Sequence, residues 1–315
     1  MFSAVVLVTS LQCNEWCGFC DFGLDERSGF SMSGKEGAEY LRAAHDLSPN
    51  SVARRVEILG GEPFLYYKDL RDIVRCASQL GFRTEVVTNG FWATTEESTR
   101  RQVGDLLDVG LDELTLTVDT YHLRHVSVAN IQRAITEIRR RGREVNIIYR
   151  VARADALDTE LIRLPAVNSG ITAITVVPWV PLGHRGPDID QRFVCRPLGN
   201  SSPGCKNLFR FVVLPGGDVA PCVVGGFRGL HRVGNLNETP AAEILTRIQT
   251  DPLLTYLYDQ GPNQLTSFLA SRDGTDELQV NASTCHLCYK VFSDGRLSSA
   301  VRDGLNSAAV GVAER

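Results

Sequence analysis

The feature that most constrains the fold of this chain is a repeated alternation of short β-branched segments with segments of helical periodicity. Six near-continuous apolar segments predict strands, and five segments with helical spacing of apolar residues accompany them. We expect strands at residues 4–9, 56–60, 84–88, 113–118, 145–151 and 173–177, and helices at residues 34–47, 68–80, 95–109, 128–141 and 155–164. This pattern indicates an α/β fold with a parallel sheet covered by helices on its outer side. Six units favour an open, partial (β/α)6 barrel with the active site at the carboxyl ends of the strands.

The pattern changes after residue 178, where Pro, Gly and Cys become frequent. A hairpin is expected from strands at 208–214 and 219–224 around a Pro-Gly-Gly-Asp turn, followed by a helix at 240–250. Residues 260–283 have no assignable pattern, and the tail is expected to be weakly helical at best. We therefore expect a barrel over residues 1–190, a small extension over 191–298 and a C-terminal tail over 299–315.

Composition excludes several classes of function. The 43% hydrophobic and 22% charged residues are those of a globular protein, and the net charge of −4 gives no basic field for nucleic acid. The apolar segments are shorter than the roughly 20 residues that a membrane span needs. The first residues lack the basic leader and cleavage site of a secretory signal, so a cytoplasmic location is expected.

Nine cysteines are unusual for such a chain, and three of them, Cys13, Cys17 and Cys20, follow the first strand directly. Three thiolates at this spacing can bind three irons of a cubane cluster and leave the fourth iron open to a small ligand. A zinc site would need a fourth ligand nearby or in a paired pattern downstream. Incidental cysteines and part of a zinc site are the alternatives.

The spacing of these cysteines, with Phe19 before the last one, resembles the signature of the radical SAM superfamily. After the second strand, Gly60-Gly61-Glu62-Pro63 resembles the segment with which this family holds the amino group of S-adenosyl-L-methionine (SAM). The resemblance implies a radical SAM core of the partial TIM-barrel type, one 4Fe-4S cluster and SAM. Its weaker matches lie at strand ends, where an ordinary polar residue is the alternative: Thr88, Asn89, Thr117, Asp119 and Arg150.

A second set of cysteines follows the barrel. A hairpin between Cys205 and Cys222 would bring these thiols together, and the later pair Cys285 and Cys288 could complete a four-thiolate site. The layout resembles the twitch type of SPASM extension and is similar to enzymes of the 2-deoxy-scyllo-inosamine dehydrogenase type, which implies one auxiliary 4Fe-4S cluster. The spacing alone also permits a structural zinc site.

Two cysteines remain. Cys76 is expected to be a small core residue of a helix. Cys195 lies between the last barrel strand and the extension, where a neutral loop thiol, a hydrogen-atom donor to a substrate radical and an alternative ligand in place of Cys205 are all open.

The resemblance implies that reductive cleavage of SAM yields a 5′-deoxyadenosyl radical that abstracts a hydrogen atom, with the auxiliary cluster as electron acceptor or donor. Polar residues are expected to line the substrate pocket, and a modest base among them would suffice for proton removal. The candidate catalytic residues are Asp119, His122, Arg150, His184 and Cys195, with Trp179 and Arg185 also expected at the pocket.

Three classes of function remain at this point. The favoured one is dehydrogenation or epimerisation of a small polar substrate, such as an aminosugar or aminocyclitol, with flavodoxin or ferredoxin as electron donor. The alternative is maturation of a ribosomally made peptide by cross-link, epimerisation or oxidation. The small molecule is preferred because the first strand begins near Ser3 and leaves no room for a leader-binding domain before the barrel. An iron–sulfur sensor or scaffold is disfavoured because it would give the segment from Gly60 to Pro63 little purpose.

Overall fold

The computed structural model describes most of the barrel and the core of the extension. The described residues are 4–15, 17, 20, 30–47, 54–119, 121–151, 173–178, 204–205, 208–224, 232–265, 269 and 284–313. Among them, none of the helices combines the length and the apolar character that crossing a membrane requires. The helix expected at residues 155–164 lies outside this part of the chain.

The six expected strands form a parallel sheet that does not close. Neighbouring strands pair in the order β6-β5-β4-β3-β2-β1, and the sheet continues from β1 into β7, β8 and β9. The parallel strands are β1 (Val5–Val8), β2 (Arg55–Leu59), β3 (Arg83–Thr88), β4 (Glu113–Thr117), β5 (Glu144–Val151) and β6 (Ala173–Pro178). The α/β class and the open, partial barrel are therefore confirmed.

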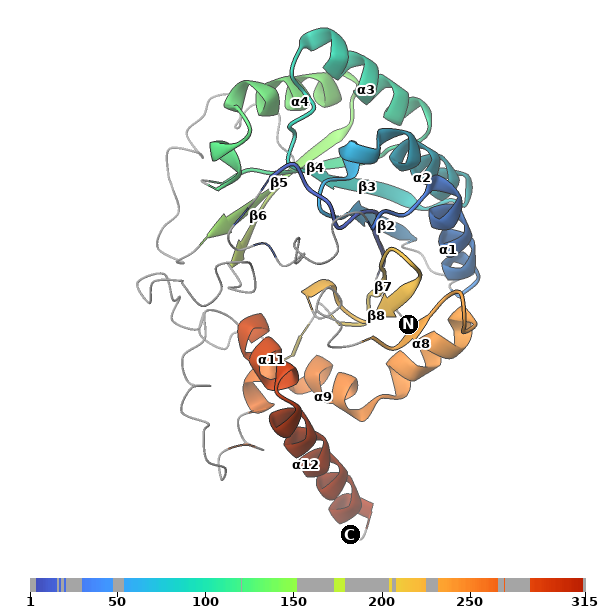
Figure 1. Ribbon diagram of the computed structural model, residues 1–315, viewed down its shortest axis with the longest axis vertical. Coiled ribbons are helices and arrows are strands. Elements are labelled where there is room, and N and C mark those ends of the chain that lie inside the picture. Colours follow the sequence, from blue (N-terminus) through green and yellow to red (C-terminus); the bar gives the residue numbers. More distant parts are fainter. Residues whose placement is uncertain are drawn as a thin grey trace.

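Four helices cover the outer side of this arc of strands (Figure 1). They are α1 (Gly34–Asp46), α2 (Tyr67–Gln79), α3 (Glu96–Asp108) and α4 (Val128–Arg140), each within one residue of the expected bounds. Ser33, Thr95 and Ser127 cap the first, third and fourth of them by accepting backbone N–H groups that have no partner inside the helix. Cys76 is buried in α2, as expected for a core residue.

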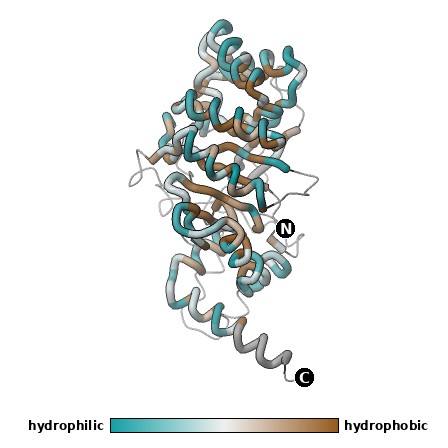
Figure 2. Tube along the Cα trace, turned by 90° about the vertical axis from the view of Figure 1, so that its right-hand side faces the viewer, coloured by the Kyte–Doolittle hydropathy of each residue, from teal (hydrophilic) through white to brown (hydrophobic). Residues whose placement is uncertain are grey.

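The two faces of the strands differ in chemistry. Side chains alternate across a strand, and Val56, Ile58, Leu114 and Leu116 face the helices in the main hydrophobic core. Figure 2 shows the apolar layer as brown strands beneath helices that mix brown and teal. The opposite face of β2 to β5 is largely polar and lines a cavity. The expectation of near-continuous apolar strands was therefore wrong for these four strands, because only one of their faces packs against helices.

The extension continues the sheet of the barrel. Strand β7 (Phe211–Val213) pairs parallel with β1, and β8 (Asp218–Ala220) and β9 (Gly234–Asn235) follow antiparallel. The turn between β7 and β8 contains Gly216 and Gly217 at φ of 85° and 86°, a region that favours glycine. The expected hairpin is confirmed, although its strands are shorter.

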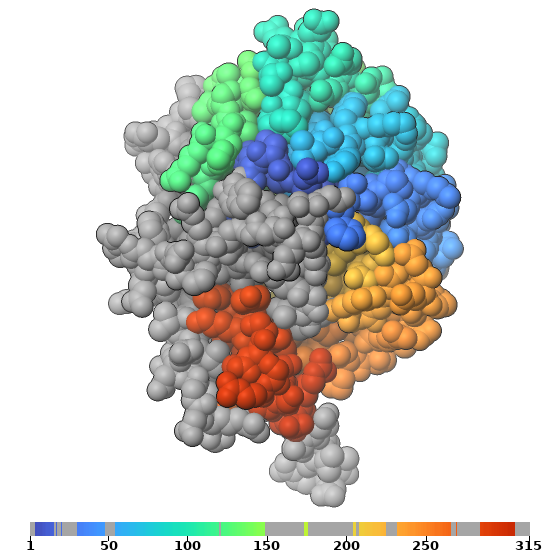
Figure 3. All heavy atoms as spheres, in the orientation of Figure 1, coloured from blue at the N-terminus to red at the C-terminus, as the bar shows by residue number. Residues whose placement is uncertain are grey.

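Helices complete the extension below the barrel, where Figure 3 shows α8 and α9 in orange and α11 in red. They are α8 (Ala241–Thr250), α9 (Pro252–Gln260), α11 (Thr284–Ser293) and α12 (Gly295–Ala313). The expectation of a weakly helical tail was wrong. Helix α12 forms because Asp294 accepts hydrogen bonds from the N–H groups of Arg296 and Leu297, and because Ala300 and Val301 are buried.

Candidate active site

A cavity of about 370 Å³ lies on the inner face of the barrel sheet and reaches the carboxyl ends of the strands. Residues from the five strands β2 to β6 and from the loop after β1 contribute to its wall. Among them are Cys13, Glu15, Cys17, Cys20, Gly60, Gly61, Glu62, Thr88, Asn89, Thr117 and His122. The fold therefore brings the first cysteine set, the glycine-rich segment and three of the predicted strand-end residues into one site.

The loop after β1 holds three thiols close together. The N–H of Glu15 donates to Cys13 Sγ at 3.4 Å, and the N–H of Cys20 donates to the carbonyl oxygen of Cys17 at 2.9 Å, so the loop turns back on itself. Burial raises the pKa of the Cys13 thiol to about 12, and burial with nearby Glu15 and Cys20 also raises the pKa of Cys17. Thiols in such surroundings become thiolates when a metal displaces their protons, and three thiols on one loop fit a cluster with an open iron.

The two glycines after β2 pack against this loop. The N–H of Gly61 donates to Ser10 O at 2.6 Å, and the N–H of Glu62 donates to Gln12 O at 2.8 Å. A Cβ atom on Gly60 would lie 2.6 Å from Ser10 O, and one on Gly61 would lie 2.1 Å from Gln12 O. The two glycines therefore allow the cysteine loop to approach this segment closely.

Glu62 links this segment to β3. Its Oε1 accepts from the Thr88 hydroxyl at 2.7 Å and from the N–H of Phe64 at 3.0 Å, and its Oε2 accepts from the N–H of Asn89 at 2.9 Å. The side chain is buried, and desolvation raises the pKa of the Glu62 carboxyl to about 7. A carboxylate oxygen can accept two hydrogen bonds, so Oε2 can accept one more. Pro63 is the first residue of the short helix that follows (Pro63–Tyr66).

Thr88 and Asn89 connect Glu62 to the cysteine loop. The amide of Asn89 donates to Asn14 Oδ1 at 3.0 Å, beside Cys13. The indole N–H of Trp92 donates to the Thr88 hydroxyl at 3.1 Å from within the core. These strand-end residues therefore form one hydrogen-bonded unit with Glu62.

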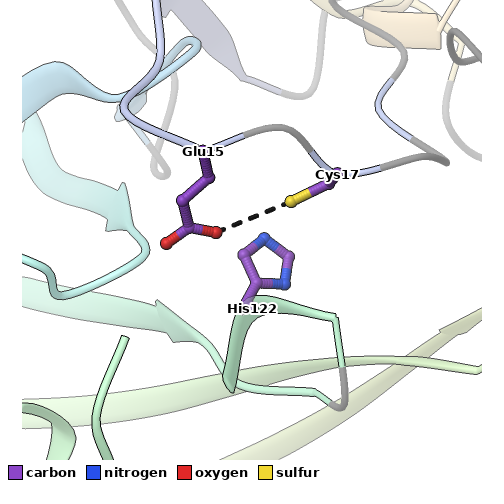
Figure 4. A group of neighbouring side chains, drawn as sticks. All are labelled: Glu15, Cys17 and His122. Atoms are coloured by element: carbon purple, nitrogen blue, oxygen red, sulfur yellow. Dashed lines mark hydrogen bonds between the residues drawn. The ribbon is translucent and has the colours of Figure 1, made fainter. Parts of the chain in front are cut away.

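Asp119 and His122 lie at the end of β4. Asp119 is fully buried, and its Oδ1 accepts from the N–H groups of Tyr121 and His122. The other oxygen lies 2.8 Å from His122 Nδ1 and fixes the imidazole ring. Ligand atoms of His122, Glu15 and Cys17 lie within 4.8 Å of one another. Figure 4 shows the three side chains grouped together. His122 thus lines the cavity. Asp119 lies behind His122 and holds its ring in place.

Sequence reasoning missed Glu15. Its carboxyl group is buried on the cysteine loop and accepts from the Cys17 thiol at 3.6 Å (Figure 4). Burial is the largest cause that raises the pKa of Glu15, while His122 and Cys17 act to lower it. An acidic residue between two cysteines is the only sequence signal of this contact, and its burial becomes evident only in the fold.

A paired charge network at the amino ends of the strands was also missed. Arg55 Nη2 lies 2.5 Å from Glu85 Oε2 and 3.2 Å from Glu113 Oε2, and Arg83 Nη2 lies 3.3 Å from Glu113 Oε2. Arg210, just before β7, lies 2.5 Å from Glu57 Oε2. The alternation of polar and apolar residues in β2 and β4 is the signal that could have revealed this inner face.

The other four predicted ligands are the cysteines of the extension. Cys205 follows the barrel and donates its N–H to Leu257 O at 2.9 Å, Cys222 follows β8, and Cys285 and Cys288 lie in α11. The pKa of Cys288 is raised by burial first and then by the neighbouring thiols of Cys222, Cys285 and Cys205. Cys288 therefore lies near the other three thiols, and a four-cysteine set suits either a cluster or a zinc ion.

Other predicted residues cannot be located in the site. Phe19, Trp179, His184, Arg185 and Cys195 lie outside the described residues. Arg150 is described only through its backbone, which belongs to β5 and pairs with Val177 of β6.

Comparisons with known proteins agree with this geometry. Residues 7–154 match the family model of the radical SAM superfamily. The barrel of this chain belongs to that superfamily. Membership implies a 4Fe-4S cluster and SAM.

Relatives of known name cover most of the chain. It is 25% identical over 291 residues to YydG of Bacillus subtilis (strain 168), which is named as a peptide biosynthesis protein, and the match covers 90% of this chain and 89% of YydG. The SuiB structure from Streptococcus suis has a TM-score of 0.58 at 18% identity, covering 80% of this chain and 66% of SuiB. BtrN, solved in complex with AdoMet and 2-DOIA, has a TM-score of 0.51 at 17% identity, covering 84% of this chain and 90% of BtrN. The two structural matches establish the fold alone.

Proposed function

We propose that this radical SAM enzyme modifies a peptide by removing a hydrogen atom from one of its carbon atoms. The observation that carries the proposal is the match to YydG, which extends through both the barrel and the extension. The preference for a small molecule, based on the position of the first strand, is thereby reversed. The type of reaction is proposed from the geometry of the site, and the class of substrate is proposed from the name of YydG.

In this proposal, Cys13, Cys17 and Cys20 hold the first cluster, and the segment from Gly60 to Pro63 faces the amino acid part of SAM. The remaining acceptor position of Glu62 Oε2 suits its ammonium group. The bound cofactors supply a 5′-deoxyadenosyl radical when an electron arrives from a cytoplasmic flavodoxin or ferredoxin. Thr88, Asn89 and Thr117 support the same wall of the cavity. Arg150 and Phe19 remain proposed contacts of the cofactor.

Asp119 and His122 are proposed to act on the substrate side. Asp119 holds the ring through Nδ1, so that the opposite nitrogen is oriented for a hydrogen bond or a proton transfer. His184 and Arg150 remain candidates for the same role, and Cys195 remains a candidate hydrogen-atom donor for an epimerisation. Replacing His122 by Asn would keep hydrogen-bonding capacity but remove the base. We expect product formation to fall while SAM cleavage continues.

Cys205, Cys222, Cys285 and Cys288 are proposed to hold an auxiliary 4Fe-4S cluster that accepts or donates an electron. Four thiolates leave no vacant iron for substrate, so electron transfer is the role that suits such a cluster. Iron and sulfide analysis of anaerobically reconstituted protein tests this assignment. About eight irons per chain would support two clusters, whereas about four irons with one zinc would contradict it.

The proposed reaction is tested with peptides encoded beside the gene of this chain, synthesised with deuterium at successive α-carbons. Transfer of deuterium into 5′-deoxyadenosine identifies the attacked position by mass spectrometry, and the mass and chirality of the peptide identify the outcome. Deuterium transfer from a peptide supports the proposal. Its absence from every peptide, while 5′-deoxyadenosine still forms, contradicts it.

A small polar substrate is the second candidate. It is favoured by the match to BtrN, which covers 90% of that chain and was solved with 2-DOIA bound. The same assay with deuterated aminocyclitols distinguishes the two. Transfer from an aminocyclitol but not from a peptide would establish dehydrogenation or epimerisation of a small molecule instead.

A further inference from the structure

Glu15 differs from the other acidic residues of the cavity. Its side chain is only 4% exposed, and one oxygen accepts from the Cys17 thiol at 3.6 Å. The other oxygen, Oε1, is buried and has no hydrogen-bond partner among the described residues. A buried carboxylate oxygen without a donor is costly, so such a group indicates a ligand that supplies the donor.

The remaining carboxylates that line the cavity are already paired. Glu57 pairs with Arg210, Glu85 and Glu113 pair with Arg55, and Glu62 accepts three hydrogen bonds from neighbouring residues. Among these acidic residues of the described cavity wall, Glu15 is therefore the one with a buried oxygen that accepts no hydrogen bond. If Cys17 bound iron as a thiolate, it would no longer donate a proton to Glu15. Glu15 Oε2 would then also lack a hydrogen-bond donor.

The position of Glu15 indicates which part of a ligand would reach it. Glu62 and Asn89 lie on the Cys13 side of the loop, where the amino acid part of SAM is proposed to bind. The carboxylate of Glu15 is directed toward Cys17 and lies near His122, on the side of the cavity where β4 ends (Figure 4). A SAM molecule that spans the cavity would direct its nucleoside toward this side, and the ribose hydroxyls and the adenine amino group are hydrogen-bond donors.

We propose that Glu15 is a cofactor-binding residue whose Oε1 accepts a hydrogen bond from the nucleoside part of bound SAM. Asp119 contributes indirectly, because it fixes the His122 ring that lies beside Glu15. The inference rests on superfamily membership and does not depend on whether the substrate is a peptide.

The test measures binding of SAM and of methionine to reconstituted protein with the cluster oxidised, so that SAM is bound but not cleaved. The variants are Glu15→Ala and Glu15→Gln, with Glu39→Ala on the exposed face of α1 as a matched control. A hydrogen bond to a charged acceptor predicts that Glu15→Ala raises the Kd of SAM about tenfold or more. Glu15→Gln keeps an acceptor oxygen without the charge, so its Kd for SAM should lie between those of wild type and Glu15→Ala. Methionine, which lacks the nucleoside, should bind wild type and variants alike.

Three results would overturn the proposal. The first is SAM binding within about twofold of wild type in both Glu15 variants, less than a hydrogen bond predicts. The second is an equal loss of methionine and SAM binding, which would move the contact to the amino acid part. The third is loss of the cluster in both variants, seen by iron content and absorbance, which would make Glu15 a structural residue. If only Glu15→Ala loses the cluster, the Kd of Glu15→Gln decides.

Failure of this inference is distinguishable from failure of the proposed function. Wild-type protein that binds SAM but transfers no deuterium from peptides contradicts the peptide proposal and leaves Glu15 untouched. Normal peptide turnover together with unchanged SAM affinity in both Glu15 variants contradicts the role of Glu15 and leaves the peptide proposal intact.

Discussion

The two ends of the barrel interior treat buried charge differently. At the amino ends of the strands, Arg55, Arg83, Glu85 and Glu113 neutralise one another within 2.5–3.3 Å. At the carboxyl ends, desolvation raises the pKa values of Cys13, Cys17 and Glu15, and Glu15 Oε1 accepts no hydrogen bond from the described residues. Charges that the chain pairs itself stabilise the fold, whereas polar groups left open at the other end are available to a cofactor.

The largest expected effect concerns the cysteine loop at the carboxyl ends of the strands. Replacing Cys17 by Ala removes one of three thiolates from the proposed cluster site and should abolish SAM cleavage. Iron content should fall by about four per chain, since a cluster with two remaining thiolates is not retained. The matched control is Cys76→Ala, because Cys76 is buried in α2 away from the cavity wall. Retention of 5′-deoxyadenosine formation by Cys17→Ala would refute the difference between the two ends.

The next effect concerns the charge network at the amino ends of the strands. Glu113→Ala leaves Arg55 and Arg83 without a shared partner and should lower the free energy of unfolding by about 3 kcal/mol, the low end for a broken buried pair. The low end applies because the two arginine side chains are 35% and 50% exposed. Glu144→Ala is the control, since Glu144 is 47% exposed and should cost less than about 1 kcal/mol. Equal losses in urea unfolding would show that the network contributes no more than surface pairs.

A smaller effect should arise where the two glycines meet the cysteine loop. A Cβ on Gly61 would lie 2.1 Å from Gln12 O, so Gly61→Ala should displace the loop and cost about 1–3 kcal/mol as overpacking does. Cluster loading should fall with it, as measured by iron content. Gly295→Ala, where no atom lies within 4 Å of the added Cβ, should have normal loading. Normal loading in Gly61→Ala would contradict the close approach.

The last expected effect is a dependence of stability on pH. Burial raises the pKa of Glu62 from 4.5 to about 7, so the folded chain binds more protons than the unfolded chain between these values. The free energy of unfolding contributed by this group therefore falls as pH rises from about 4.5 to about 7. Urea unfolding of the metal-free protein across this range should show a steeper fall in wild type than in Glu62→Gln. Parallel curves would mean that Glu62 is not held in a desolvated site.

Local patterns predicted the elements of the barrel well, because strand and helix periodicities depend on neighbouring residues. The spacing of Cys13, Cys17 and Cys20 and the glycines before Glu62 also identified one cavity wall, since both follow parallel strands whose ends meet. The proposed roles of Phe19, His184 and Cys195 remain predictions.

Other features depended on contacts between distant residues and could not be predicted in this way. The pairing of β7 with β1 joins segments about 200 residues apart, and no local pattern specifies it. The polar inner face was visible in the alternation of Arg55, Val56 and Glu57 but was overlooked in favour of apolar content. Helix α12 depends on the cap at Asp294 and on burial against the extension, which outweigh its weak periodicity.

The parallel pairing of β1 with β7 has a consequence for how this enzyme can be divided. Strand β1, which carries the cysteine loop at its end, has hydrogen-bonded neighbours on both sides. Cutting the chain after the barrel would leave one flank of that strand with exposed backbone groups and remove the ion pair of Arg210 with Glu57. Although two modules are recognisable along the sequence, they share one continuous sheet, so the strand that carries the cysteine loop is held in part by residues about two hundred positions later in the chain.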